Sequence, residues 1–121
     1  MRRLKIDYRG GENFTREDGV NVTIKTYAIN SEGYSPYYYI KHNIHELKDG
    51  SSFSTITINK DRAIQYLPDL YCEYDENENP VFTIQTASYG ALTVDEIDNM
   101  IDKLSIAQRT VEILEMYRDY L

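Results

Sequence analysis

The chain has 121 residues, with 13 Lys or Arg against 20 Asp or Glu, so its formal net charge is -7. This length predicts one domain over residues 1–121, with enough apolar residues to form a core. The negative charge argues against a protein that coats DNA or an anionic membrane. The single cysteine excludes an internal disulfide framework. No apolar run approaches the ~20 residues of a membrane span, and the N-terminus has no signal peptide, so we expect a cytoplasmic protein that does not bind membranes.

The first half of the chain has the residue pattern of strands. Residues 4–8 and 20–29 alternate apolar and polar side chains, and 37–41 and 53–59 are rich in residues that favour strands. Residues 9–19 are polar and hold three glycines, so we expect a loop there.

The middle of the chain is less decisive. Residues 42–50 fit either a short helical turn or the end of the preceding strand, and 60–67 fit either one helical turn or a continued strand. Residues 70–74 and 81–86 predict a hairpin, because the connection between them holds only turn formers and acids.

The last third predicts one long helix over residues 94–120. Thr93 and Glu96 have the spacing of a capping box, and no Gly or Pro interrupts the helix. At 1.5 Å per residue it would be about 40 Å long. Its expected inner stripe is Ile97, Met100, Leu104, Ala107, Val111 and Leu114, widened by Ile101 and Tyr117.

A run of strands followed by one helix predicts the α+β class. We expect a twisted, mainly antiparallel sheet of five or six strands, with the helix packed across one face. From the strands, the expected core takes Leu4, Ile6, Val22, Ile24, Ile56, Ile58, Phe82 and Ile84.

No motif in the sequence indicates catalysis, a metal or a cofactor. His42 and His45 do not have the spacing of a zincin helix, and residues 75–86 lack the Gly and Glu of an EF-hand loop. Cys72 lies within a strand with no base fixed beside it. We therefore expect a protein that is not an enzyme; a site built from scattered residues is a third alternative, behind the two binding functions below.

Acidic residues gather at the expected hairpin tip and along the start of the helix. Such a surface suits a basic, nucleic-acid-binding protein partner, steered by charge. The expected partner-binding residues are Glu73, Asp75, Glu76 and Glu78 on the hairpin and Asp95, Asp98 and Asp102 on the helix.

The alternative is a nucleic-acid-binding module, since a basic cluster at the N-terminus and a tyrosine-rich strand can contact phosphates and stack on bases. Its residues would be Arg2, Arg3, Tyr37, Tyr39 and Lys41. A sheet with one uncovered, tyrosine-rich face would also suit a homo-oligomer.

Residues 66–71 (YLPDLY), 82–93 (FTIQTASYGALT) and the helix as far as Leu114 resemble small uncharacterised proteins carried by phages and conjugative elements of Gram-positive bacteria. The resemblance covers the C-terminal half and carries no site residue. It implies an accessory protein of a mobile element, a setting that includes inhibitors of host defence nucleases such as anti-CRISPR proteins. Our leading hypothesis is therefore a non-catalytic interaction protein with an acidic surface that competes for a nucleic-acid groove.

Overall fold

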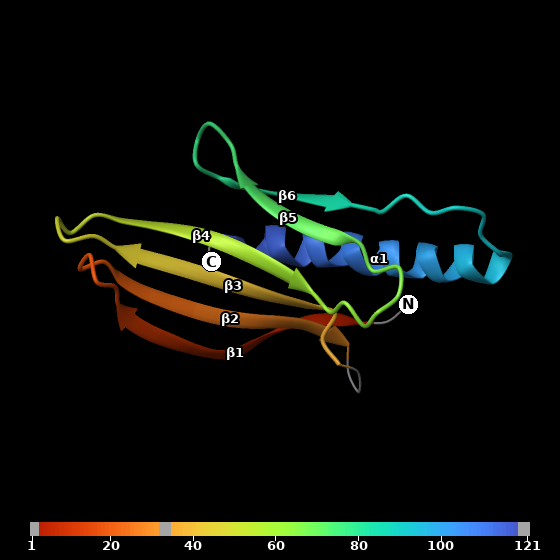
Figure 1. Cartoon of the computed structure of the whole chain (residues 1–121), viewed down its shortest axis with the longest axis horizontal. Coiled ribbons are helices and arrows are strands. Elements are labelled where there is room, and N and C mark those ends of the chain that lie inside the picture. The colour runs from red at the N-terminus through yellow and green to blue at the C-terminus, as the bar shows by residue number, and fades with distance from the viewer. Residues whose placement is uncertain (1–2, 32–34, 119–121) are drawn as a thin grey trace.

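Six strands and one helix make up the fold, in a computed structural model that describes residues 3–31 and 35–118 (Figure 1). The elements are β1 (Leu4–Thr15), β2 (Asn21–Ser31), β3 (Tyr38–Glu46), β4 (Ser52–Lys60), β5 (Asp69–Tyr74), β6 (Pro80–Gln85) and α1 (Val94–Tyr117).

The strands form two antiparallel sheets. Strands β1 to β4 pair in chain order, while β5 and β6 form a separate hairpin that lies against β4 (Figure 1). The α+β class is confirmed, but a single sheet of five or six strands is wrong. The turn between β4 and β5 explains the separation, because Tyr66 has a φ of +66° and Pro68 has no backbone N–H to donate to a ladder.

Strand β1 is much longer than the sequence predicts. The expected loop over residues 9–19 is wrong for its first part, since β1 continues through it to Thr15. A β-bulge between Tyr8 and Gly10 keeps the strand paired with β2, and Gly10 takes a φ of +125° that favours glycine. Residues 42–50 were expected to form either a helical turn or the end of a strand; β3 continues as a strand as far as Glu46.

The register decides which face of the four-stranded sheet is the core. Ile6, Ile29 and Tyr38 lie opposite one another across β1, β2 and β3, and directly paired residues share a face. Ile29 and Tyr38 are fully buried in the main hydrophobic cluster. Val22 and Ile24 have the opposite parity in β2, so they lie on the outer face and outside the main cluster. The expected burial of Val22 is confirmed, since it is 3% exposed, whereas Ile24 is only half-buried.

Helix α1 contacts β1, an edge strand of the four-stranded sheet, and β6 of the two-stranded hairpin. Figure 1 shows that only the C-terminal half of α1 runs beside the four-stranded sheet, while the N-terminal half projects past it. The buried helix residues accordingly lie in the second half: Ile106, Ala107, Thr110, Ile113 and Leu114.

Three positions of the expected helix stripe are exposed and so wrong as core residues: Ile97, Ile101 and, at the C-terminal end of the helix, Tyr117. Ile97 is 39% exposed and Ile101 is 56% exposed, because no sheet lies over the first half of the helix. The capping box is confirmed: Thr93 Oγ1 accepts from the Glu96 N–H at 3.2 Å, and Glu96 Oε1 accepts from the Thr93 N–H at 3.1 Å. The helix reaches Tyr117, and the expected end at Tyr120 lies outside the described residues.

Candidate protein-interaction site

Strand β1 is one of the two edge strands of the four-stranded sheet; the other, β4, lies against β5. Strand β1 pairs with β2 on one side only. Within residues 3–31 and 35–118, no other strand, loop or helix makes a backbone hydrogen bond to its outer side. An edge of this kind offers a row of unpaired N–H and C=O groups to an extended chain.

A groove of about 840 Å³ runs between this edge and α1. One wall is the start of β1, residues 3–6; the other is one face of α1 from Ser105 to Tyr117. Leu4 and Ile113 are buried at the base, whereas Met116 is 64% exposed. The groove therefore combines an apolar base with unpaired backbone on one side.

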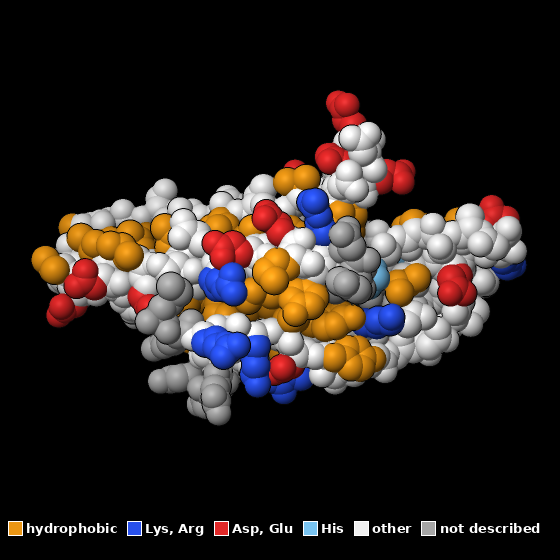
Figure 2. All heavy atoms as spheres, turned by 180° about the vertical axis from the view of Figure 1, so that it is seen from behind, with side chains coloured by type: hydrophobic (Ala, Val, Ile, Leu, Met, Phe, Trp, Pro, Cys, Tyr) orange, Lys and Arg blue, Asp and Glu red, His pale blue; other side chains and the backbone are white. Residues whose placement is uncertain are grey.

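Figure 2 shows this side of the molecule, where a band of hydrophobic side chains is bordered by Lys and Arg side chains. Three cations line the groove: Arg3 and Lys5 on the β1 wall and Arg109 on the helix wall. The surroundings are thus locally basic in a chain whose net charge is -7.

The expected acidic surface divides into two separate parts. The β5–β6 hairpin, with Glu73, Asp75, Glu76 and Glu78, projects away from the body, and the start of α1, with Asp95 and Asp98, lies at a far end of the molecule (Figures 1 and 2). The structure therefore does not bring the two clusters together on one contact surface.

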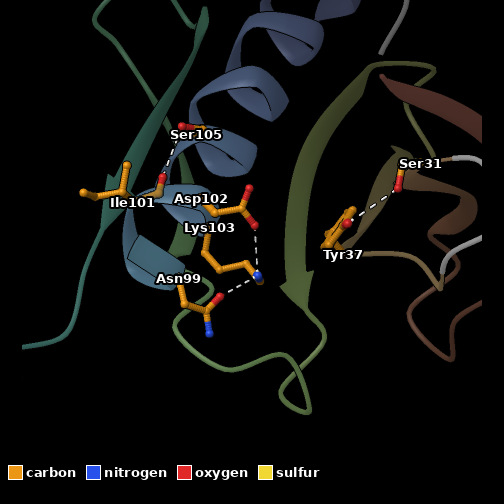
Figure 3. A network of polar contacts seen from close by, with 7 residues as sticks. All are labelled: Ser31, Tyr37, Asn99, Ile101, Asp102, Lys103 and Ser105. Atoms are coloured by element: carbon orange, nitrogen blue, oxygen red, sulfur yellow. Dashed lines mark hydrogen bonds and ion pairs between the residues drawn. The ribbon is translucent and has the colours of Figure 1, made fainter. Parts of the chain in front are cut away.

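In each cluster, one acidic side chain makes hydrogen bonds or an ion pair with neighbouring residues. Asp75 Oδ1 accepts hydrogen bonds from the backbone N–H groups of Asn77 and Asn79, both at 2.9 Å, and so shapes the hairpin turn. On α1, Lys103 Nζ lies 3.1 Å from Asp102 Oδ2 and donates to Asn99 Oδ1 at 2.8 Å (Figure 3). One acid of each cluster is therefore engaged in a local contact.

The residues of the nucleic-acid alternative are also dispersed. Tyr37 is only 3% exposed and belongs to the core cluster, so its ring is not offered to a base. Tyr39 is 40% exposed and, by register, lies with Lys41 on the outer face of the sheet. Arg3 lines the groove beside α1, and Arg2 lies outside the described residues.

A second, smaller cavity of about 340 Å³ lies beneath the projecting half of α1. Tyr66 and Tyr89 pack edge to face at its border, with ring centroids 5.2 Å apart. Tyr66 donates from its hydroxyl to Glu96 Oε2 at 2.7 Å, and this bond, with the N–H and hydroxyl of Thr93, lowers the pKa of the Glu96 carboxyl. The bond fixes the unusual backbone of Tyr66 to the first turn of the helix.

His42 is a buried histidine without a visible polar partner. Neither ring nitrogen makes a hydrogen bond to any residue that the structure describes. Burial, and then the charge of Lys25, lower the pKa of the His42 imidazole. The other histidine, His45, stacks on Phe53 with ring centroids 4.6 Å apart on the outer face.

This environment predicts a pH dependence of stability. Because the folded-state pKa of His42 lies below the unfolded value of about 6.5, the unfolded chain takes up the proton first as the pH falls. Stability is thus present above pH ~6.5 and is lost progressively below it. In urea unfolding at several pH values, His42→Phe should show a smaller loss from pH 7.5 to 5 than the wild type, while His45→Phe should keep the wild-type loss. Equal losses in all three proteins would contradict this origin.

Cys72 does not have the environment of a nucleophile. It is half-buried on the inner side of the β5–β6 hairpin, opposite Phe82, and burial raises the pKa of its thiol. Among the described residues, no three His, Cys, Asp or Glu side chains are placed to hold a metal ion. In that same part of the chain, no helix has the length and hydrophobicity that crossing a bilayer requires.

The groove residues Lys5, Ile6, Arg109 and Met116 were not among the expected site residues. One signal was present: Lys5 and Arg9 flank the apolar positions of the first strand, and charges of this kind are typical of edge strands. The helix wall gives no comparable signal, because which helix face borders β1 depends on tertiary packing.

Comparisons with known proteins add no relative. No protein family model, no curated protein and no solved structure matches the chain.

Proposed function

We propose that the chain is a non-catalytic protein-interaction module that binds an extended segment of its partner along β1. The observation that carries the proposal is the free outer edge of β1 beside the groove under α1. In strand addition, main-chain hydrogen bonds supply affinity and alternate side chains enter neighbouring pockets. The groove has room for those side chains, and its base is apolar.

The bulge divides the edge into two stretches. Between Tyr8 and Gly10 the ladder with β2 is irregular, so a continuous added strand fits one side of the bulge only. The first stretch, Leu4–Tyr8, lines the groove with its residues 4–6, whereas Gly11–Thr15 lies beyond the lining residues. We therefore place the bound segment along Leu4–Tyr8.

Backbone methylation of a probe peptide tests this mode of binding. The probe is a ten-residue peptide of alternating valine and glutamine, titrated into the ¹⁵N-labelled protein. We expect the amide signals of Leu4–Tyr8 to shift. Two analogues carry N-methyl groups on the valines or on the glutamines, and only one set of amides can face β1 in an added strand. One analogue should lose binding and the other should keep it; equal binding by both, or no shift within Leu4–Tyr8, would disprove strand addition.

The acidic hairpin supports a second candidate, in which the module competes for the nucleic-acid groove of a basic partner. The tip stands clear of the body in Figures 1 and 2, so Glu76 and Glu78 can enter a groove that the rest of the chain cannot. This proposal agrees with the resemblance of the C-terminal half to accessory proteins of mobile elements. The targets of such proteins include host defence nucleases. A partner captured from a nuclease-treated bacterial lysate at low salt should be lost with Glu76→Lys plus Glu78→Lys and retained with Glu12→Lys plus Glu17→Lys. Retention by both double variants would exclude the hairpin.

A further inference from the structure

Resting on the proposed strand addition, we infer that the segment bound along β1 is an acidic stretch of a partner protein, with carboxylates alternating with apolar side chains. The three cations that line the groove, Arg3, Lys5 and Arg109, carry this inference. A single acidic side chain, Glu112, lines it with them.

The cations are available to a ligand. Lys5 Nζ lies 3.7 Å from Asp7 Oδ2, and Arg109 Nη1 lies 2.9 Å from Glu112 Oε2, with exposed side chains in both pairs. Exposed ion pairs contribute little, so exchanging a partner costs little. Arg3 makes no ion pair with any residue that the structure describes.

Successive side chains of an added strand point to opposite faces of the sheet, so acidic and apolar residues should alternate along the bound segment. Side chains on the inner face of the segment would continue the row of Leu4 and Ile6 and meet the apolar base at Ile113. Side chains on the other face would continue the row of Lys5, which pairs with Asn30 on the outer face of the sheet. A carboxylate at these positions lies beside Lys5, and opposite charges on neighbouring strands stabilise pairing.

The same charges disfavour a second copy of this chain as the occupant. Pairing the first part of β1 with itself would bring together two copies of residues 3–9, each with Arg3, Lys5 and Arg9 against the acid Asp7, while Glu12 lies beyond the bulge. Like charges on facing strands destabilise the pair, and edge lysines and bulges are features that oppose self-pairing. An acidic segment gains from the charges that repel a second copy.

The test compares three capped ten-residue peptides with valine at alternate positions and Glu, Gln or Lys at the others. NMR titration of the ¹⁵N-labelled protein gives the Kd of each from the amide signals of Leu4–Tyr8. We expect the Glu peptide to bind ~fivefold more tightly than the Gln peptide, the size of one or two exposed ion pairs. The Lys peptide should bind most weakly, and the differences should shrink at 0.5 M salt.

Variants of the chain locate the effect. Lys5→Gln should remove most of the advantage of the Glu peptide over the Gln peptide, because Lys5 is the cation on the face of β1 where the carboxylates of the segment would lie. Arg16→Gln is the matched control, because Arg16 is an exposed cation paired with Asp18 in the turn after β1. This control should keep the full ratio.

The outcomes separate this inference from the proposed function. Equal Kd values for the Glu and Gln peptides, with shifts at Leu4–Tyr8, would overturn the acidic preference and leave strand addition standing. No shift there with any peptide would overturn both. Shifts of the same amides with protein concentration alone would show that a second copy occupies the edge and would overturn the acidic partner.

Discussion

Leu114→Ala is expected to lower the free energy of unfolding by about 2–5 kcal/mol, the range for removing a fully buried leucine side chain. Leu114 is 0% exposed and lies in the main core cluster, where α1 covers the sheet. The cost combines lost burial with the cavity that the truncated side chain leaves. Urea unfolding followed by circular dichroism measures it, and Leu114→Val, a smaller truncation, should give a smaller loss if the alanine variant does not fold.

The matched control is Ile101→Ala on the same helix. The sequence pattern places both residues on one apolar stripe, yet Ile101 is 56% exposed, so its truncation should cost less than ~1 kcal/mol. Equal losses at the two positions would show that the first half of α1 is covered in solution, contrary to the projecting helix in Figure 1.

These two positions show what periodicity can and cannot predict. Spacings of 3 and 4 residues identify the apolar face of a helix, and Leu114 is correctly placed by them. They do not show how far along that face the covering sheet extends, since this depends on strands that are distant in sequence. Ile97 and Ile101 therefore read as core and are largely exposed.

Strand β2 shows the same limit for a sheet. Val22 and Ile24 lie on one face and Tyr27 and Ile29 on the other, so apolar residues occur on both faces. Alternation alone then cannot show which face joins the main core cluster; the pairing of Ile29 with Ile6 and Tyr38 does. The capping box and the β5–β6 hairpin were predicted correctly. Both depend only on residues that are close together in the sequence.

For the candidate site, the sequence predicted the strand over residues 4–8 but not its place at the edge of the sheet. The order of strands follows from long-range pairing, and the bulge at Gly10 let β1 continue through a stretch that reads as a loop. The acidic residues are numerous and predict a docking surface, yet the fold separates the two clusters. The three cations of the groove come from both ends of the chain, so only the fold brings them together.

Tyr38→Phe is expected to lower the free energy of unfolding by about 1–3 kcal/mol, because it leaves a buried carbonyl without its donor. The Tyr38 side chain is fully buried, and its hydroxyl donates to the Pro68 carbonyl oxygen at 2.6 Å. This bond ties β3 to the turn that precedes β5. Tyr39→Phe is the control: its side chain is 40% exposed on the opposite face, so the change should cost less than ~0.5 kcal/mol.

The pH dependence of the same variants reports the burial of the Tyr38 hydroxyl. Burial, and then the charge of Asp69, raise the pKa of the Tyr38 hydroxyl above its ordinary value of 10.0. The unfolded chain therefore ionises first, so the stability from Tyr38 is present below pH ~10 and is lost as the pH rises further. Tyr38→Phe should lose less stability than the wild type between pH 9 and 10.5, whereas Tyr39→Phe should follow the wild type. If Tyr38→Phe instead loses as much stability as the wild type over this interval, the Tyr38 hydroxyl ionises as readily in the folded protein as in the unfolded chain, which would contradict its burial between β3 and the turn before β5.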